Sequence, residues 1–118
     1  MPKKILVAHG NTQYLKKSVI DLQQLGFSVI ATPDGGDAFA RFFEEEPDIV
    51  ICSQSLPGLS GVNFGQMVLS QSPHTHVIIL RDGPDEEGLD AFMTLPDPLD
   101  VHHLAGLLPD FMPEQIEE

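Results

Sequence analysis

A short apolar run between polar residues constrains the fold more than any other part of the chain. The run covers residues 49–52, follows Asp48 and ends at Ser53, and Pro57-Gly58 marks a turn shortly after it. Continuous apolar stretches of this length are typical of strands that are buried on both faces of a parallel sheet. In α/β folds, the carboxyl ends of such strands open onto the binding edge of the sheet. The sequence therefore predicts a central strand whose functional end lies at Ser53.

Strand-like and helix-like patterns alternate along the rest of the chain. Strands are predicted at residues 5–8, 27–32, 48–53, 76–80 and 92–94. Helices are predicted from a cap at Asn11 or Thr12 to Gly26, at 37–46, at 62–70, and from a cap at Asp97 to Pro109. The inward positions are expected to be Leu15, Val19 and Leu22 in the first helix, Ala38, Phe39, Phe42 and Phe43 in the second, and Val101, Leu104, Leu107 and Leu108 in the last. This order predicts a three-layer α/β domain with one parallel sheet.

Size and charge narrow the classes of partner. A chain of 118 residues is expected to form a single domain, with residues 109–118 as a tail or linker. The net charge of −12 argues against nucleic acid and anionic membranes as partners and favours proteins with basic surfaces. The single cysteine, Cys52, permits no disulfide within the chain, and the amino-terminal apolar stretch is too short for a signal peptide. We expect a cytoplasmic protein.

Several short motifs, in order, resemble the landmarks of bacterial response-regulator receiver domains, the CheY-like family. They are Lys3-Lys4-Ile5-Leu6-Val7, Asp34-Gly35, Pro47-Asp48-Ile49-Val50, Leu56-Pro57-Gly58 with Gly61, and Pro96 with Asp97-Pro98. The resemblance covers nearly the whole chain. It implies a flavodoxin-like fold with a five-stranded parallel sheet in the order 2-1-3-4-5. It also implies a place in two-component signalling, where a receiver accepts a phosphoryl group from a histidine kinase.

The residues that carry the family's chemistry are replaced at the matching positions. The resemblance places the phosphoacceptor position at Ser53 and the acidic, metal-binding positions at His9 and Gly10. It places the Thr or Ser after strand four at Arg81, the Lys after strand five at Leu95, and the aromatic switch position at Phe92. Mg²⁺ requires hard oxygen ligands, and a serine without a base or metal is a poor phosphoryl acceptor. The sequence therefore predicts a degenerate pseudo-receiver with no cofactor, no Mg²⁺ and no catalytic residue.

The connection between the fourth and fifth strands is short. Residues 81–91 contain Gly83-Pro84 and Gly88, whereas a parallel crossover usually needs about a dozen residues or more. We therefore predict that the family's fourth helix is truncated or missing. The shortening is expected to bare apolar surface, which a signalling protein or a second copy of the chain would cover.

These observations favour a protein-interaction module that is not phosphorylated, and three alternatives remain. The first is a small-anion or nucleotide site formed by His9, Ser53 and Arg81 at the strand ends, unless Arg81 pairs with Asp82 or Asp85 instead. The second is an enzyme that uses a Ser53–His9 pair. The third is phosphotransfer through an acceptor elsewhere, for which Asp48 is poorly placed because it starts its strand.

Overall fold

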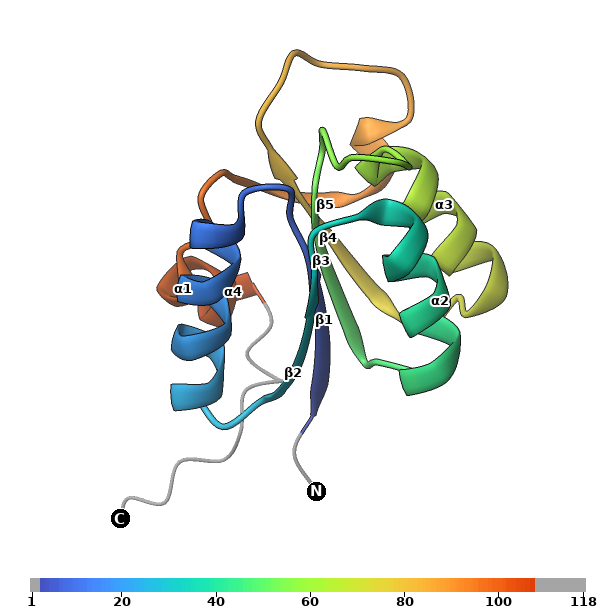
Figure 1. Cartoon of the computed structure of the whole chain (residues 1–118). Helices are drawn as coiled ribbons and strands as arrows, with labels where there is room; N and C mark the ends of the chain where they lie inside the picture. Colours follow the sequence, from blue (N-terminus) through green and yellow to red (C-terminus); the bar gives the residue numbers. More distant parts are fainter. Residues whose placement is uncertain (1–2, 108–118) are drawn as a thin grey trace.

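The chain folds around one parallel sheet. The computed structural model describes residues 3–107. The strands are β1 (Lys4–Ala8), β2 (Ser28–Thr32), β3 (Ile49–Ser53), β4 (His76–Arg81) and β5 (Met93–Pro96). Their order is β2-β1-β3-β4-β5, and all neighbours pair in parallel (Figure 1). The predicted fold class and strand order are confirmed, and β3 lies at the centre of the sheet.

Helices cover both faces of the sheet, and the sheet divides the core in two. The helices α1 (Thr12–Gln24) and α4 (Val101–Leu107) lie on one face, and α2 (Gly35–Glu45) and α3 (Gly61–Gln71) lie on the other (Figure 1). Alternate strand residues point to opposite faces, so Ile5 packs under α1 and α4 whereas Leu6 packs under α2 and α3. Among residues 3–107, no helix has the length and hydropathy needed to cross a membrane.

Side-chain caps fix where three of the helices begin. The Asn11 side chain accepts hydrogen bonds from two amides of the first turn of α1, and Ser60 accepts one from α3. Helix α2 begins two residues earlier than the pattern predicted, because the carboxylate of Asp34 caps it through the amide of Asp37. The pKa of Asp37 is lowered by hydrogen bonds from the Thr32 hydroxyl and the Arg41 guanidinium.

Two predictions about the last strand and helix were wrong. Strand β5 extends to Pro96, and the last helix begins at Val101, with Asp100 accepting a hydrogen bond from the amide of His102. Asp97 therefore does not cap this helix, because its carboxylate bonds to His9 instead. The predicted positions Leu108 and Pro109, and the proposed tail at 109–118, lie outside the described residues.

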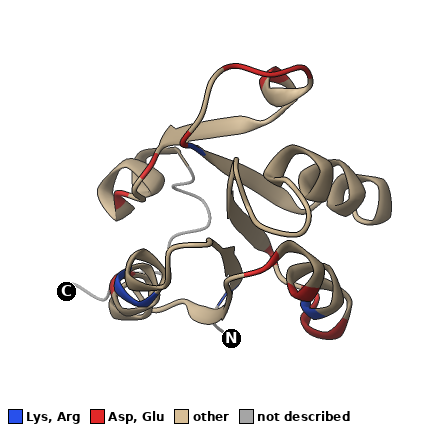
Figure 2. Cartoon of the chain, turned by 45° about the horizontal axis from the view of Figure 1, so that its top comes forward, with Lys and Arg blue, Asp and Glu red and all other residues tan. Residues whose placement is uncertain are grey.

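The family's fourth helix is reduced to a single 3₁₀ turn, η1 (Leu89–Ala91), as predicted. The Leu89 side chain is buried, and Phe92 packs beside Gly65 of α3, where an added methyl group would lie 2.8 Å from the Phe92 ring. The loop thus covers surface that we expected it to leave bare, although Met93 remains 37% exposed. Figure 2 shows acidic residues along this loop between β4 and β5.

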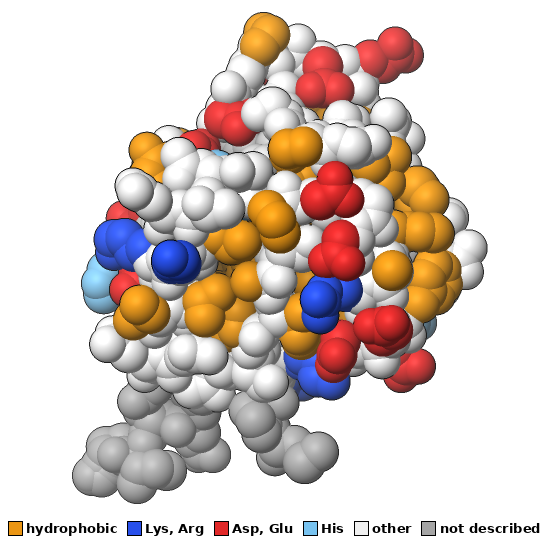
Figure 3. All heavy atoms as spheres, in the orientation of Figure 1, with side chains coloured by type: hydrophobic (Ala, Val, Ile, Leu, Met, Phe, Trp, Pro, Cys, Tyr) orange, Lys and Arg blue, Asp and Glu red, His pale blue; other side chains and the backbone are white. Residues whose placement is uncertain are grey.

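The predicted apolar face of α2 is only partly correct. Ala38 and Phe42 are buried and Phe39 is half-buried, but Phe43 is 49% exposed. The Phe43 ring packs edge-on against both Phe39 and Phe42 rather than against the sheet. Figure 3 shows hydrophobic side chains gathered at the surface over α2 and α3.

The thiol of Cys52 is predicted to be inert in the folded protein. Cys52 is fully buried in β3, and burial raises its pKa to about 12, so the thiolate is absent at ordinary pH. We expect no reaction with a thiol-specific disulfide reagent at pH 8 over hours, and complete reaction once the chain is unfolded in urea. Rapid labelling of the native protein would show that β3 opens readily.

Candidate functional site

A pocket lies at the carboxyl ends of the central strands, as the sequence predicted. Its walls are His9 and Gly10 after β1, Ser53 at the end of β3 and Asp82 after β4, with Asn11, Tyr14, Ser55 and Pro57 completing the lining. Parallel pairing brings these strand ends together. Ser53 is 1% exposed, and its hydroxyl has no hydrogen-bond partner among residues 3–107. The structure thus brings three of the predicted positions, His9, Gly10 and Ser53, into one site.

His9 is held by hydrogen bonds at both ring nitrogens. Its Nδ1 lies 3.0 Å from the backbone amide of Asn11, which can only donate, so Nδ1 must accept. The proton of the ring therefore lies on Nε2, which donates to Oδ1 of Asp97 at 2.7 Å. The ring is buried and neutral, and it packs edge-on against Tyr14 with 5.5 Å between the ring centroids.

This tautomer limits the chemistry of His9. A general base for Ser53 needs a free imidazole lone pair, and so does an imidazole ligand to a metal ion. The Nδ1 lone pair of His9 is occupied by the Asn11 amide, and Nε2 carries the proton. The geometry therefore provides no base for the Ser53–His9 enzyme considered from the sequence.

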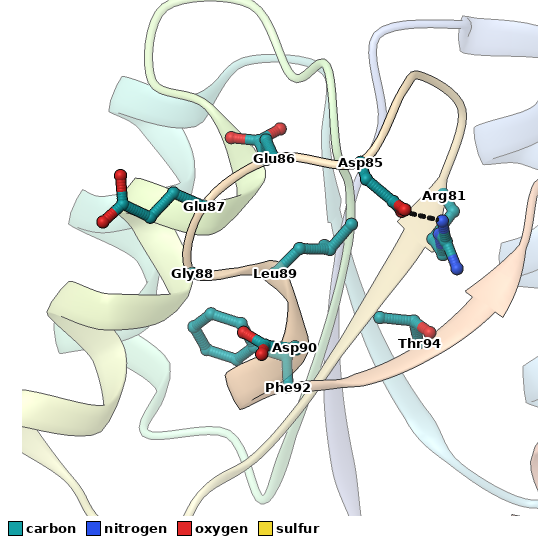
Figure 4. Close-up of a pocket in the computed structure, with 9 residues that line it drawn as sticks. All are labelled: Arg81, Asp85, Glu86, Glu87, Gly88, Leu89, Asp90, Phe92 and Thr94. Carbon is teal, nitrogen blue, oxygen red and sulfur yellow. Dashed lines mark hydrogen bonds and ion pairs between the residues drawn. The ribbon is translucent and has the colours of Figure 1, made fainter.

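Arg81 does not converge with His9 and Ser53, so that prediction was wrong. Its guanidinium forms an ion pair with Asp85, one of the two partners that the sequence offered (Figure 4). Arg81 lines a different depression, together with Phe92, Thr94 and the acidic loop. Leu95 also lies away from the pocket, because it is inside β5 and buried in the core under α1 and α4.

Two carboxylates that were not predicted to belong to the site lie there instead, Asp82 in the lining of the pocket and Asp97 behind His9. Asp97 bonds to His9, and Asp82 accepts hydrogen bonds from the amide of Ser55 at 3.1 Å and from its hydroxyl at 2.6 Å. One nitrogen of His9 and one oxygen each of Asp82 and Asp97 all lie within 4.8 Å of one another. Asp82 directly follows β4 and Asp97 directly follows β5, and both strands end later than the sequence predicted. The pocket is therefore negatively charged.

Gln54 joins the loop after β3 to the loop after β4. It is 4% exposed, and its amide nitrogen donates to the carbonyl of Pro84 at 2.6 Å and to the carboxylate of Glu86 at 2.8 Å. Its amide oxygen accepts from the backbone amide of Gly83 at 3.1 Å. Three hydrogen bonds from one buried side chain thus fix the first half of the β4–β5 loop. Gln54 was not predicted to take part in the site.

The amino-acid sequence is similar to that of a known bacterial regulatory protein. The chain is 30% identical over 105 residues to the alkaline phosphatase synthesis transcriptional regulatory protein PhoP of Bacillus subtilis. The match covers 81% of this chain but only 43% of the relative, so the chain spans less than half of that protein. No protein-family model matches the chain.

Solved structures resemble the chain over nearly its whole length. The beryllofluoride-activated DrrB receiver domain superimposes with a TM-score of 0.78 at 29% identity, covering 94% of this chain and 97% of that one. The chemotaxis protein CheY4 of Vibrio cholerae shares the fold, with a TM-score of 0.81 at 22% identity over 95% of this chain and all of that one. The fold, the sheet order and these relationships place the chain in the CheY-like family of response-regulator receiver domains.

Proposed function

We propose that this receiver domain is a pseudo-receiver, which acts in two-component signalling as a protein-interaction module without being phosphorylated. The observation that carries the proposal is the charge of the pocket at the end of β3. A neutral Ser53 stands at the position that the family relationship assigns to the acceptor, and the ionisable neighbours are the carboxylates of Asp82 and Asp97 beside a neutral His9. The family's reaction requires cationic compensation of the phosphoryl group at this place.

Electrostatics oppose a phosphoryl group in this pocket. Each additional like charge at about 4–5 Å costs roughly 3–4 kcal/mol at the effective dielectric constant near a protein surface. Arg81 does not offset this repulsion, because it is paired with Asp85 outside the pocket. The same reasoning disfavours the alternative of a small-anion or nucleotide site at His9, Ser53 and Arg81. Positions 9, 10 and 53, where the family relationship places the ligands of Mg²⁺, hold no carboxylate.

The hydrogen bonds of Gln54 support a constant interaction surface. A switch needs an element with two arrangements of similar free energy. Here the loop after β4 is tied to β3 by the side chain of Gln54 and by the Ser55–Asp82 pair. A cytoplasmic signalling protein, or a second copy of this chain, would then recognise one permanent conformation.

Amide NMR tests the absence of phosphoryl chemistry. Spectra are recorded during titration with Mg²⁺ and then with beryllofluoride, a phosphoryl mimic, in the presence of Mg²⁺. We expect no saturable shifts at His9, Ser53 or Asp82, because the pocket lacks an acceptor carboxylate and a cation of its own. A receiver domain that retains the acceptor aspartate, titrated under identical conditions, serves as the positive control. Saturable shifts centred on Ser53 would contradict the proposal.

A further inference from the structure

We propose that the pocket at the ends of β1, β3 and β4 binds an organic cation, the guanidinium or ammonium group of an Arg or Lys side chain of a partner protein. The inference rests on the proposed function only in taking the cation from a partner. Asp82 lines the pocket, and one oxygen of Asp97 lies within 4.8 Å of one oxygen of Asp82. No Lys or Arg lines the pocket among residues 3–107. The charge that these carboxylates create is thus uncompensated within the described part of the chain.

The groups that remain free in the pocket are hydrogen-bond acceptors. The hydroxyl oxygen of Ser53 has no partner within residues 3–107, although the residue is 99% buried at 1% relative exposure. Each carboxylate oxygen of Asp82 accepts one hydrogen bond from Ser55 and has a further lone pair that can accept another. Asp97 accepts from His9 at one oxygen only. An unpaired hydroxyl that reaches the surface of the pocket lined by Asp82, with Asp97 close to Asp82, is the arrangement that N–H donors of a cation would complete.

The spacing of the acceptor atoms fits a nitrogen cation. One nitrogen about 2.8 Å from each of two oxygens can bridge oxygens up to about 5.6 Å apart. The ligand atoms of His9, Asp82 and Asp97 lie within 4.8 Å of one another. In addition, the proton on Nε2 of His9 removes the imidazole lone pair that a transition metal would require.

Tyr14 lines the pocket with an aromatic ring, which also attracts cations. Its ring is 40% exposed at the mouth of the pocket and is oriented by its edge-on contact with His9. Aromatic rings attract cations, and guanidinium groups in particular stack against them. The carboxylates, the free hydroxyl and the ring therefore favour the same class of ligand.

The test is an amide NMR titration of the intact chain with methylguanidinium chloride. A parallel titration with sodium chloride at equal ionic strength serves as the reference. We expect saturable shifts at residues 9–14, 53–55 and 82. Asp82→Asn keeps an acceptor for the amide of Ser55 but removes the charge, and it is expected to weaken binding about tenfold. Ser53→Ala is expected to weaken binding less. Asp90→Asn removes an exposed charge from the same loop and should leave binding unchanged.

Two further arms identify the source and class of the cation. A blocked Gly-Arg-Gly tripeptide that binds at least as tightly as methylguanidinium supports a side chain of a partner. A tripeptide that fails to enter overturns the partner source. Saturation by Mg²⁺ or Zn²⁺ in place of methylguanidinium, or equal weakening by Asp82→Asn and Asp90→Asn, overturns the assigned site. The methylguanidinium and tripeptide arms do not depend on the Mg²⁺ and beryllofluoride titrations, so in these arms the two proposals fail separately.

Discussion

Adding a methyl group at Gly61 is expected to destabilise the domain by about 3 kcal/mol or more and to lower its melting temperature by roughly 10–15 °C. Gly61 begins α3, and its amide donates to the carbonyl of Gln54 at 3.0 Å. A Cβ atom there would lie 2.3 Å from the carbonyl oxygen of Ser53 and 3.1 Å from the Cα of Gln54. Both contacts are with backbone, which cannot move aside without displacing the end of β3.

Gly106→Ala is the matched control for Gly61→Ala. Gly106 lies in α4, and an added Cβ would meet no atom within 4 Å. Alanine in a helix restricts the unfolded chain and is expected to be neutral or to stabilise by about 0.4–1 kcal/mol. Urea unfolding followed by circular dichroism measures both variants. A Gly61→Ala protein as stable as Gly106→Ala would contradict the close approach of α3 to β3.

Replacing Gln54 by alanine is expected to release the β4–β5 loop. The change removes the amide that bonds to Gly83, Pro84 and Glu86, and the loss of the three hydrogen bonds is expected to cost about 2–3 kcal/mol. Because these bonds hold the loop rather than the sheet, we expect the amide of Gly83 to exchange with solvent about tenfold faster or more. Amides of β1 and β3 should keep most of their protection. Native-state hydrogen exchange measured by NMR provides the readout.

Gln23→Ala removes the same side-chain atoms from an exposed position of α1 and serves as the control. Gln54→Glu adds a second test, because it would place a carboxylate against Glu86 and remove both donated bonds. We expect it to free the loop at least as much as alanine does. Unchanged exchange at Gly83 in both Gln54 variants would show that the loop is held by other contacts.

The sheet was predictable because its signals are local. Residues 49–52 form an uninterrupted apolar run, and each strand before β5 is bounded by polar or turn residues. The boundaries of β5 and α4 were less predictable. The sequence from Leu95 to Pro98 contains two prolines, and either the strand or the helix can end there. The bond between Asp97 and His9 connects residues far apart in the chain, and no local pattern reveals it.

The site was predicted in position but not in charge. Parallel pairing guarantees that residues after β1, β3 and β4 meet, which explains why His9, Gly10 and Ser53 share a pocket. It does not determine which of two consecutive residues faces that pocket. Arg81 and Asp82 are adjacent, and the structure turns Asp82 inward while Arg81 pairs with Asp85. A difference of one sequence position thus places the anionic Asp82 in the pocket instead of the cationic Arg81.

The division of the core by the sheet has a consequence for how such a domain can evolve. The two apolar clusters draw on strand interiors and helix faces, and none of His9, Ser53, Asp82 and Asp97 belongs to either. Selection for a stable fold and selection for chemistry therefore act on separate residues. The residues at the strand ends can therefore change while the apolar scaffold stays the same. A receiver fold therefore does not by itself show that the domain accepts a phosphoryl group.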